Sequence, residues 1–184
     1  MKVVIVDSQA SAWDSFVQSA QDATPYHQFK WKTVITKSFG HECHYFGAID
    51  SNGAWQGVLP LVHMRNKLFG NFLISVPFVN YGGLLYMNDS AAGTLLEEAE
   101  RLRRSLGATH VELRHVGGTL EGVPTRQHKV TMILDLAADG QPVACFQRLD
   151  TQQDTKSGEK WPAIRGQSAR TARWVLYGFC PQYA

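Results

Sequence analysis

The segment Val76–Gly83 combines residue types suited to binding a ligand at the rim of a sheet. It follows an apolar run that reads as a strand, and it ends in Asn80, Tyr81, Gly82 and Gly83. A strand end of this kind presents backbone amides and polar side chains where ligands commonly bind. A glycine turn beside a core phenylalanine is the alternative interpretation. We take the four terminal residues as candidates for substrate binding.

Two further side chains could contribute to the same chemistry. Arg114 ends a later apolar run, and its guanidinium group could hold an anionic ligand, although a surface salt bridge is an equal alternative. Trp31 stands between Lys30 and Lys32 and could serve as a stacking platform. The core is favoured for Trp31, because aromatic residues in helices usually face inward. Both residues remain substrate-binding candidates.

The run His41-Glu42-Cys43-His44 does not predict a metal site. Its spacing is not that of a zinc-binding HExxH helix. On a strand, His41 and Cys43 share one face while Glu42 and His44 share the other. We read it as a half-exposed strand with mixed side chains and expect no metal. No Ser/His/Asp or Cys/His set is recognisable either, so the catalytic residues stay unassigned.

Hydrophobic periodicity predicts a mixed α/β domain. The expected strands are Val3–Val6, Cys43–Ile49, Trp55–Val62, Phe72–Val79, His110–Leu113 and Val130–Leu136, and Ser90–Leu106 is the clearest helix. Two shorter helices are expected, around residues 11–20 and 29–39. Ser51-Asn52-Gly53 between two extended runs is a strong hairpin signal. The predicted core includes Ile5, Trp13, Phe16, Trp31, Phe39, Phe46, Val58, Leu61, Phe72, Ile74, Leu95, Leu102, Val111 and Ile133.

Composition limits the classes of function. The 184 residues carry a formal net charge of +2, but positions 151–184 hold five Lys/Arg and two Asp/Glu, so positions 1–150 are at −1. The main part of the chain is therefore not basic, and charge gives no argument for nucleic-acid binding. Three cysteines without paired spacing favour free thiols in a reducing compartment. With no signal-peptide or membrane-span pattern, the expected location is cytoplasmic.

The stretch from about residue 10 to residue 150 resembles the FemAB-related proteins associated with PEP-CTERM/exosortase systems. The resemblance rests on several segments in order: Trp31 in a helix, the strand GVLPL at Gly57–Leu61, LFG at Leu68–Gly70, SVPFVNYGG at Ser75–Gly83, and ELRH at Glu112–His115.

This resemblance implies an acyltransferase built from two GNAT-like domains. Positions 1–140 would form the first domain, which shapes the acceptor cleft, with a largely antiparallel mixed sheet flanked by helices. The best-known FemAB proteins move an amino acid from aminoacyl-tRNA to an amine on a peptidoglycan precursor, a transfer that depends mainly on positioning. Residues 1–150 lack the Arg/Gln-x-x-Gly-x-Gly/Ala pattern with which GNAT enzymes bind coenzyme A. We therefore expect no cofactor on this domain. The acyl donor, aminoacyl-tRNA or acyl-CoA, would belong to the second domain.

The tail, positions 141–184, departs from the family and is expected to be aberrant. From Gln152 onward it keeps neither helical nor strand periodicity. One permitted choice of codons, read one base later, gives an RKAEKNG-like helix, as the family would have, and the shift places glycine where Trp161 and Trp174 stand. A natural short paralogue with a divergent tail is the alternative. We expect an insertion or deletion near the codons for Thr151–Gln153, and a tail without a fixed fold.

Two functional classes follow. One is a truncated acyl- or aminoacyltransferase, inactive alone, that acts on a small-molecule or cell-envelope acceptor. Transfer RNA would be a partner only if the missing second domain were supplied. The other class is a non-catalytic module that binds a cell-wall or polysaccharide precursor.

Overall fold

The hairpin that the Asn-Gly turn predicts forms the centre of the sheet. Strand β2 (Glu42–Ile49) pairs antiparallel with β3 (Trp55–Asn66) in a computed structural model of the chain. The Asp50 carboxylate orders the turn, since its Oδ1 accepts hydrogen bonds from the backbone amides of Asn52 at 2.8 Å and Ala54 at 2.9 Å. The structure describes residues 1–66, 70–115, 120, 122–126 and 174–177. All of these belong to one compact unit.

The other strands extend this hairpin on both sides. Strand β1 (Lys2–Ile5) pairs antiparallel with β2, and β4 (Gly70–Ile74) pairs antiparallel with β3. Strand β6 (Val111–Leu113) lies parallel to β4, followed by β8 (Trp174–Tyr177) and β7 (Thr125–Arg126). The short strand β5 (Leu85–Tyr86) pairs with β3 at Gly57 and Val58. Strands β4 and β5 thus pair with different parts of β3, and the loop between them contains the predicted binding segment.

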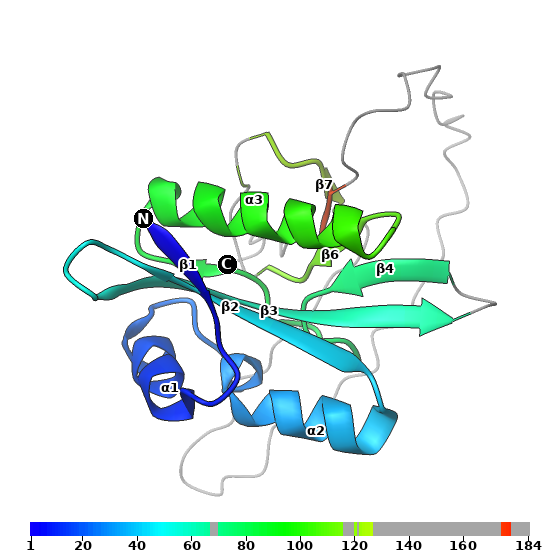
Figure 1. Ribbon diagram of the computed structural model, residues 1–184, viewed down its shortest axis with the longest axis horizontal. Coiled ribbons are helices and arrows are strands. Elements are labelled where there is room, and N and C mark those ends of the chain that lie inside the picture. The colour runs from blue at the N-terminus through cyan, green and yellow to red at the C-terminus, as the bar shows by residue number, and fades with distance from the viewer. Residues whose placement is uncertain (67–69, 116–119, 121, 127–173, 178–184) are drawn as a thin grey trace, which may run out of the picture. The chain divides into compact units, whose positions relative to one another are not determined.

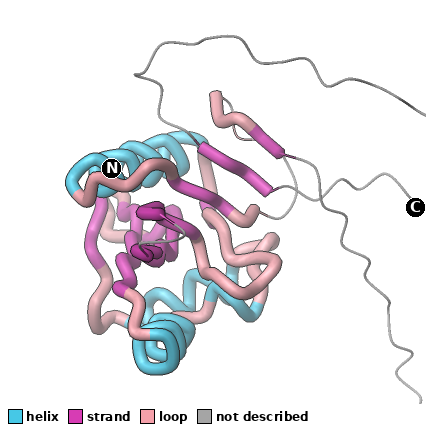
Figure 2. The backbone as a smooth tube through the Cα atoms, turned by 90° about the vertical axis from the view of Figure 1, so that its right-hand side faces the viewer, coloured by secondary structure: helices cyan, strands magenta, loops and turns pink. Residues whose placement is uncertain are grey.

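Helices cover both faces of the sheet. Figure 1 shows α3 (Asp89–Ser105) over one face and α1 (Ala10–Ser19) and α2 (Lys30–Phe39) over the other. The view turned by 90° shows the strands between these helical layers (Figure 2). Local chemistry fixes the helix ends. Asn88 Oδ1 accepts the Ala91 amide at 3.0 Å at the start of α3. Gly40 ends α2 with a left-handed φ of 69°.

Two principal clusters of apolar side chains hold these layers together. The α3 side packs Phe46, Leu59, Leu61 and Leu95 into one buried cluster, among others. The α1 side buries aromatic residues, namely Trp13, Phe16, Phe29 and Tyr45, with Val58. A smaller cluster under α2 contains Ile35, Val62 and Ile74. The strict alternation of β2 and β3 between these clusters explains why the hairpin register is well determined.

The predicted core is confirmed at most positions and wrong at two. Buried as expected are Trp13, Phe16, Phe46, Val58, Leu61, Ile74, Leu95 and Val111. Partly buried against the clusters are Trp31, Phe72 and Leu102. Ile5 is 66% exposed because β1 is an edge strand that reaches past the helices, and Phe39 is 49% exposed because it lies in the last turn of α2. Ile133 lies outside the described residues.

Some predicted element bounds are also wrong. The strand expected at Phe72–Val79 ends at Ile74, because Val76 and Phe78 adopt positive φ angles of 27° and 68° that a strand does not allow. The tail was expected to have no regular structure, yet Trp174–Tyr177 forms β8 beside β6. Its sequence Trp-Val-Leu-Tyr has high strand propensity. The strand was not predicted because the residues around it show no regular apolar pattern. The rest of the tail and the expected strand Val130–Leu136 lie outside the described residues.

The expected fold class is confirmed by these elements. They form a mixed α/β fold with a largely antiparallel sheet flanked by helices. Among the described helices, none combines the length and the apolar character needed to cross a membrane.

Candidate functional site

The predicted binding segment packs against the end of β6. Gly83 is buried so tightly that a Cβ atom there would lie 2.7 Å from the Arg114 carbonyl oxygen. The Ser75 hydroxyl accepts a hydrogen bond from the Arg114 backbone amide at 2.8 Å. Glycine is therefore required at position 83 by close backbone approach. The loop and β6 form one continuous wall.

Arg114 holds this loop in place. Its Nη1 donates a hydrogen bond to the Val79 carbonyl, and its Nε donates to Glu112 Oε1 at 3.2 Å. Of the two roles open to Arg114 in the sequence, the structure shows the ion pair, with Glu112 as the partner. Binding of an anionic ligand by the same guanidinium group stays a prediction.

The remaining candidates lie in three different environments. Asn80 is exposed, whereas the Tyr81 hydroxyl is buried and has no hydrogen-bond partner among the described residues. Trp31 is partly buried, donates from Nε1 to the Pro25 carbonyl at 3.1 Å, and meets the ring of Tyr26 edge-on at 5.5 Å. Trp31 therefore supports the loop through Tyr26 more directly than it offers a free stacking face.

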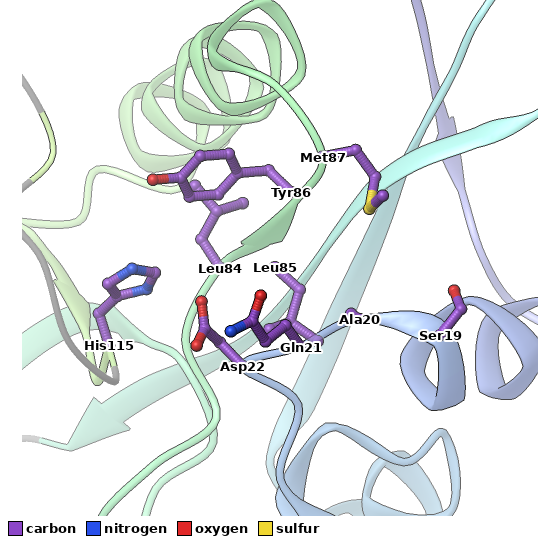
Figure 3. A pocket seen from close by; sticks show the side chains of 9 residues that line it. All are labelled: Ser19, Ala20, Gln21, Asp22, Leu84, Leu85, Tyr86, Met87 and His115. Atoms are coloured by element: carbon purple, nitrogen blue, oxygen red, sulfur yellow. The ribbon is translucent and has the colours of Figure 1, made fainter.

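A cavity of about 400 Å³ opens next to this wall. Its lining comes from the end of α1 and the residues after it, from β5 with its flanking residues, and from the second residue after β6 (Figure 3): Ser19, Ala20, Gln21, Asp22, Leu84, Leu85, Tyr86, Met87 and His115. None of the predicted site residues lines it. Gly83 and Arg114 instead lie immediately before Leu84 and His115 in the chain and bring those two residues together.

His115 is the buried titratable group of this cavity. Its side chain is 7% exposed and stacks on Tyr86 with ring centroids 6.2 Å apart. Burial lowers the pKa of His115 below its ordinary value, while the Asp22 carboxylate and a backbone hydrogen bond with Leu84 act in the opposite direction. A neutral imidazole at pH 7 has one nitrogen that can accept a proton. The cavity therefore combines a proton acceptor, a carboxylate and a phenol.

A similarity search finds FemX among solved structures. That crystal structure matches with a TM-score of 0.45 and 19% sequence identity over 60% of this chain, and the match spans 26% of the FemX chain. No protein-family model and no curated protein sequence matches. A similarity of this strength does not identify an activity.

Arg114, which was predicted from the sequence, directly precedes His115, which lines the cavity. The segment ELRH contains His115, and its position after the strand Val111–Leu113 was a usable signal. Asp22 and Gln21 carry no such signal, because they follow α1 in an ordinary turn and reach the cavity only through packing.

Adding a methyl group at Gly83 is expected to separate the loop from β6. The new Cβ would meet backbone atoms of Arg114, which cannot rotate away, so Gly83→Ala should destabilise the fold by about 1–3 kcal/mol. Gly93→Ala is the matched control, because nothing lies within 4 Å of that position in α3. The control should gain about 0.5–1 kcal/mol from helix propensity. Urea unfolding of both variants tests this, and equal effects would contradict it.

Proposed function

We propose that this chain is the acceptor-side part of a FemAB-like acyl- or aminoacyltransferase that acts on an amine of a cell-envelope precursor. The observation that carries the proposal is the cavity in which neutral His115 and the Asp22 carboxylate lie beside Tyr86. Two of its walls adjoin segments that resemble the family, since Leu84–Met87 follows Ser75–Gly83 directly and His115 is the last residue of Glu112–His115.

The chemistry assigns separate roles to these groups. An acceptor amine enters as an ammonium ion, which the Asp22 carboxylate attracts and orients. To attack an ester carbon, the nitrogen must lose a proton, and neutral His115 can accept it. The nitrogen–carbon bond then forms while the bond from the acyl carbon to the donor oxygen of aminoacyl-tRNA, or to the sulfur of acyl-CoA, breaks. The second proton lost by the nitrogen passes to the departing group, which leaves as an alcohol or a thiol. Leu85 and Met87 supply apolar surface to the cavity.

The finer parts of the proposal concern the partner and the setting. The donor, aminoacyl-tRNA or acyl-CoA, would need a second domain, so we expect no turnover by these 184 residues alone. The acceptor would be peptidoglycan- or exopolysaccharide-linked and the location cytoplasmic. A binding module that lacks transfer chemistry would use the same cavity.

Calorimetry with a soluble, amine-bearing peptidoglycan precursor tests the site. Asp22→Asn should weaken binding by roughly tenfold or more, because a charge-assisted hydrogen bond is worth about 1.5–3 kcal/mol. Glu97→Gln, which removes an exposed carboxylate of α3, is the matched control and should bind like the wild type. Equal binding by Asp22→Asn and the wild type would exclude the cavity as the acceptor site.

A transfer assay separates the enzyme from the binding module. When a FemAB-type donor domain and charged transfer RNA are supplied, His115→Gln should lower the rate at least a hundredfold while precursor binding changes little. Unchanged transfer by His115→Gln would remove its role as a base. Transfer by the purified chain without any donor domain would show that the half-enzyme proposal is wrong.

A further inference from the structure

Three potential metal ligands converge on the central hairpin, away from the cavity. Glu42 and His44 lie two positions apart on β2, so their side chains share one face of the sheet. His63 on β3 lies directly opposite Glu42 in the antiparallel register. One ligand atom from each of these three residues falls within 4.8 Å of the other two. The sequence alone predicts that Glu42 and His44 share one face of a strand. It does not show the pairing of β2 with β3, which places His63 opposite Glu42.

Asn71 determines which nitrogen of His63 carries the proton. The Asn71 Nδ2 donates to the Leu106 carbonyl at 2.9 Å, which leaves Asn71 Oδ1 as the acceptor facing His63 Nε2 at 2.6 Å. His63 Nε2 must therefore donate, and in the neutral ring Nδ1 keeps its lone pair. That Nδ1 lies 3.9 Å from Glu42 Oε2. His63 is only 8% exposed, so its orientation is held by packing.

His44 presents a second atom in need of a partner. Its Nε2 is buried and has no hydrogen-bond partner among the described residues, although it lies 3.4 Å from Glu42 Oε1. A buried polar atom without a partner is costly and calls for an explanation. With the proton of His44 on Nδ1, two imidazole lone pairs and a carboxylate face one another with no donor between them. A cation at their centre would satisfy all three.

We propose that Glu42, His44 and His63 bind a zinc-type divalent metal ion. Two imidazoles and one carboxylate form a known zinc donor set, with water in the fourth position. Ligand atoms around tetrahedral zinc lie about 3.3 Å apart, from bond lengths of about 2.0–2.2 Å. The Glu42 oxygens lie 3.4 Å from His44 Nε2 and 3.9 Å from His63 Nδ1, close to this spacing, and the Glu42 side chain is 66% exposed and can adjust. The Asn71 carbonyl that orients His63 is the usual outer-shell partner of a ligating histidine.

Cobalt binding to the full, chelator-treated chain tests this site. Co²⁺ should bind with one ion per chain and visible absorption bands typical of tetrahedral geometry, and Zn²⁺ should displace it. Glu42→Gln and His44→Gln should each weaken binding at least tenfold. His41→Gln is the matched control, because His41 is a neighbouring histidine that precedes β2, stacks with Phe39 and Phe78 and is not among the three converging ligands, and it should bind like the wild type.

The same titration distinguishes a metal from a proton. If a protonated histidine satisfies Glu42 instead, the wild type will show no stoichiometric Co²⁺ band up to millimolar ion, and the proposal fails. Equal binding by the wild type, Glu42→Gln and His44→Gln would place the ion elsewhere and would also overturn it. Circular dichroism of each variant verifies folding. Glu42→Gln keeps the test decisive should His44→Gln misfold, because the Glu42 side chain is largely exposed.

Discussion

Trp13→Ala is expected to remove much of the stability of the domain. Trp13 is fully buried, stacks on Tyr45 with ring centroids 4.8 Å apart, and meets Phe29 edge-on at 5.9 Å. Its Nε1 donates a buried hydrogen bond to the His27 carbonyl at 2.7 Å. Truncating a buried tryptophan costs about 3–5 kcal/mol, against a typical total of about 5–15 kcal/mol.

Urea unfolding followed by circular dichroism measures this loss. Phe39→Ala is the matched control, since it also removes an aromatic ring, but one that is 49% exposed, and it should cost well under 1.5 kcal/mol. Trp13→Phe keeps an apolar ring and loses the hydrogen bond to His27, so it should fall between the two. A loss below 1 kcal/mol for Trp13→Ala would mean that the α1 side is not packed as described.

Acid is expected to destabilise the domain through His27 well before the carboxylates titrate. Burial lowers the pKa of His27 from 6.5 to about 4, and a backbone hydrogen bond with Gly83 only partly opposes this. The Thr24 amide donates to His27 Nδ1 at 3.0 Å, which requires a lone pair on that nitrogen. The folded state therefore holds His27 neutral.

The sign of the effect follows from the two pKa values. Between pH 6.5 and about 4 the unfolded chain binds a proton that folded His27 does not, so stability falls as the pH falls through this window. The full contribution, present above pH 6.5, is roughly 3 kcal/mol at 1.36 kcal/mol per pKa unit.

Unfolding free energies measured from pH 7.5 to 4 test this dependence. His115 and His44 also have pKa values lowered by burial and add to the slope, so the comparison must be with His27→Gln. The variant should be less stable at pH 7.5 but show a flatter dependence below pH 6.5. Parallel curves for the variant and the wild type would show that His27 is not the group responsible.

Sequence predicted those parts of the fold that depend on local chemistry. The Asn-Gly hairpin, the short helix around residues 29–39 and the long helix α3 are all determined by neighbouring residues, and each is found close to its predicted position. Strand β5 was missed, because a two-residue strand has no periodicity and exists only through its pairing with β3. Ile5 was wrongly predicted to lie in the core. The apolar pattern around it indicates a strand, but it does not show how much of that strand the helices cover.

The residues predicted for the site lie next to the cavity in the chain but do not line it. Gly83 and Arg114 have recognisable types, but their observed role is to hold the loop and β6 together. The cavity needs Asp22, which arrives from the end of α1 by packing that no local pattern reports. His63 illustrates the same limit, because only the register of the hairpin brings it opposite Glu42.

The cavity is lined by three segments that are distant in the sequence, so ligand binding is coupled to folding. Residues 19–22, 84–87 and 115 meet only when α1, β5 and β6 are all in place, so the unfolded chain offers no competing site. By mass action, an occupant present at a hundred times its dissociation constant adds about 2.7 kcal/mol to the unfolding free energy. Shifts in melting temperature can therefore rank candidate acceptors before any transfer assay exists. Gly83 allows two of these walls to meet. It should therefore contribute to the affinity for a ligand in the cavity, although it does not line the cavity itself.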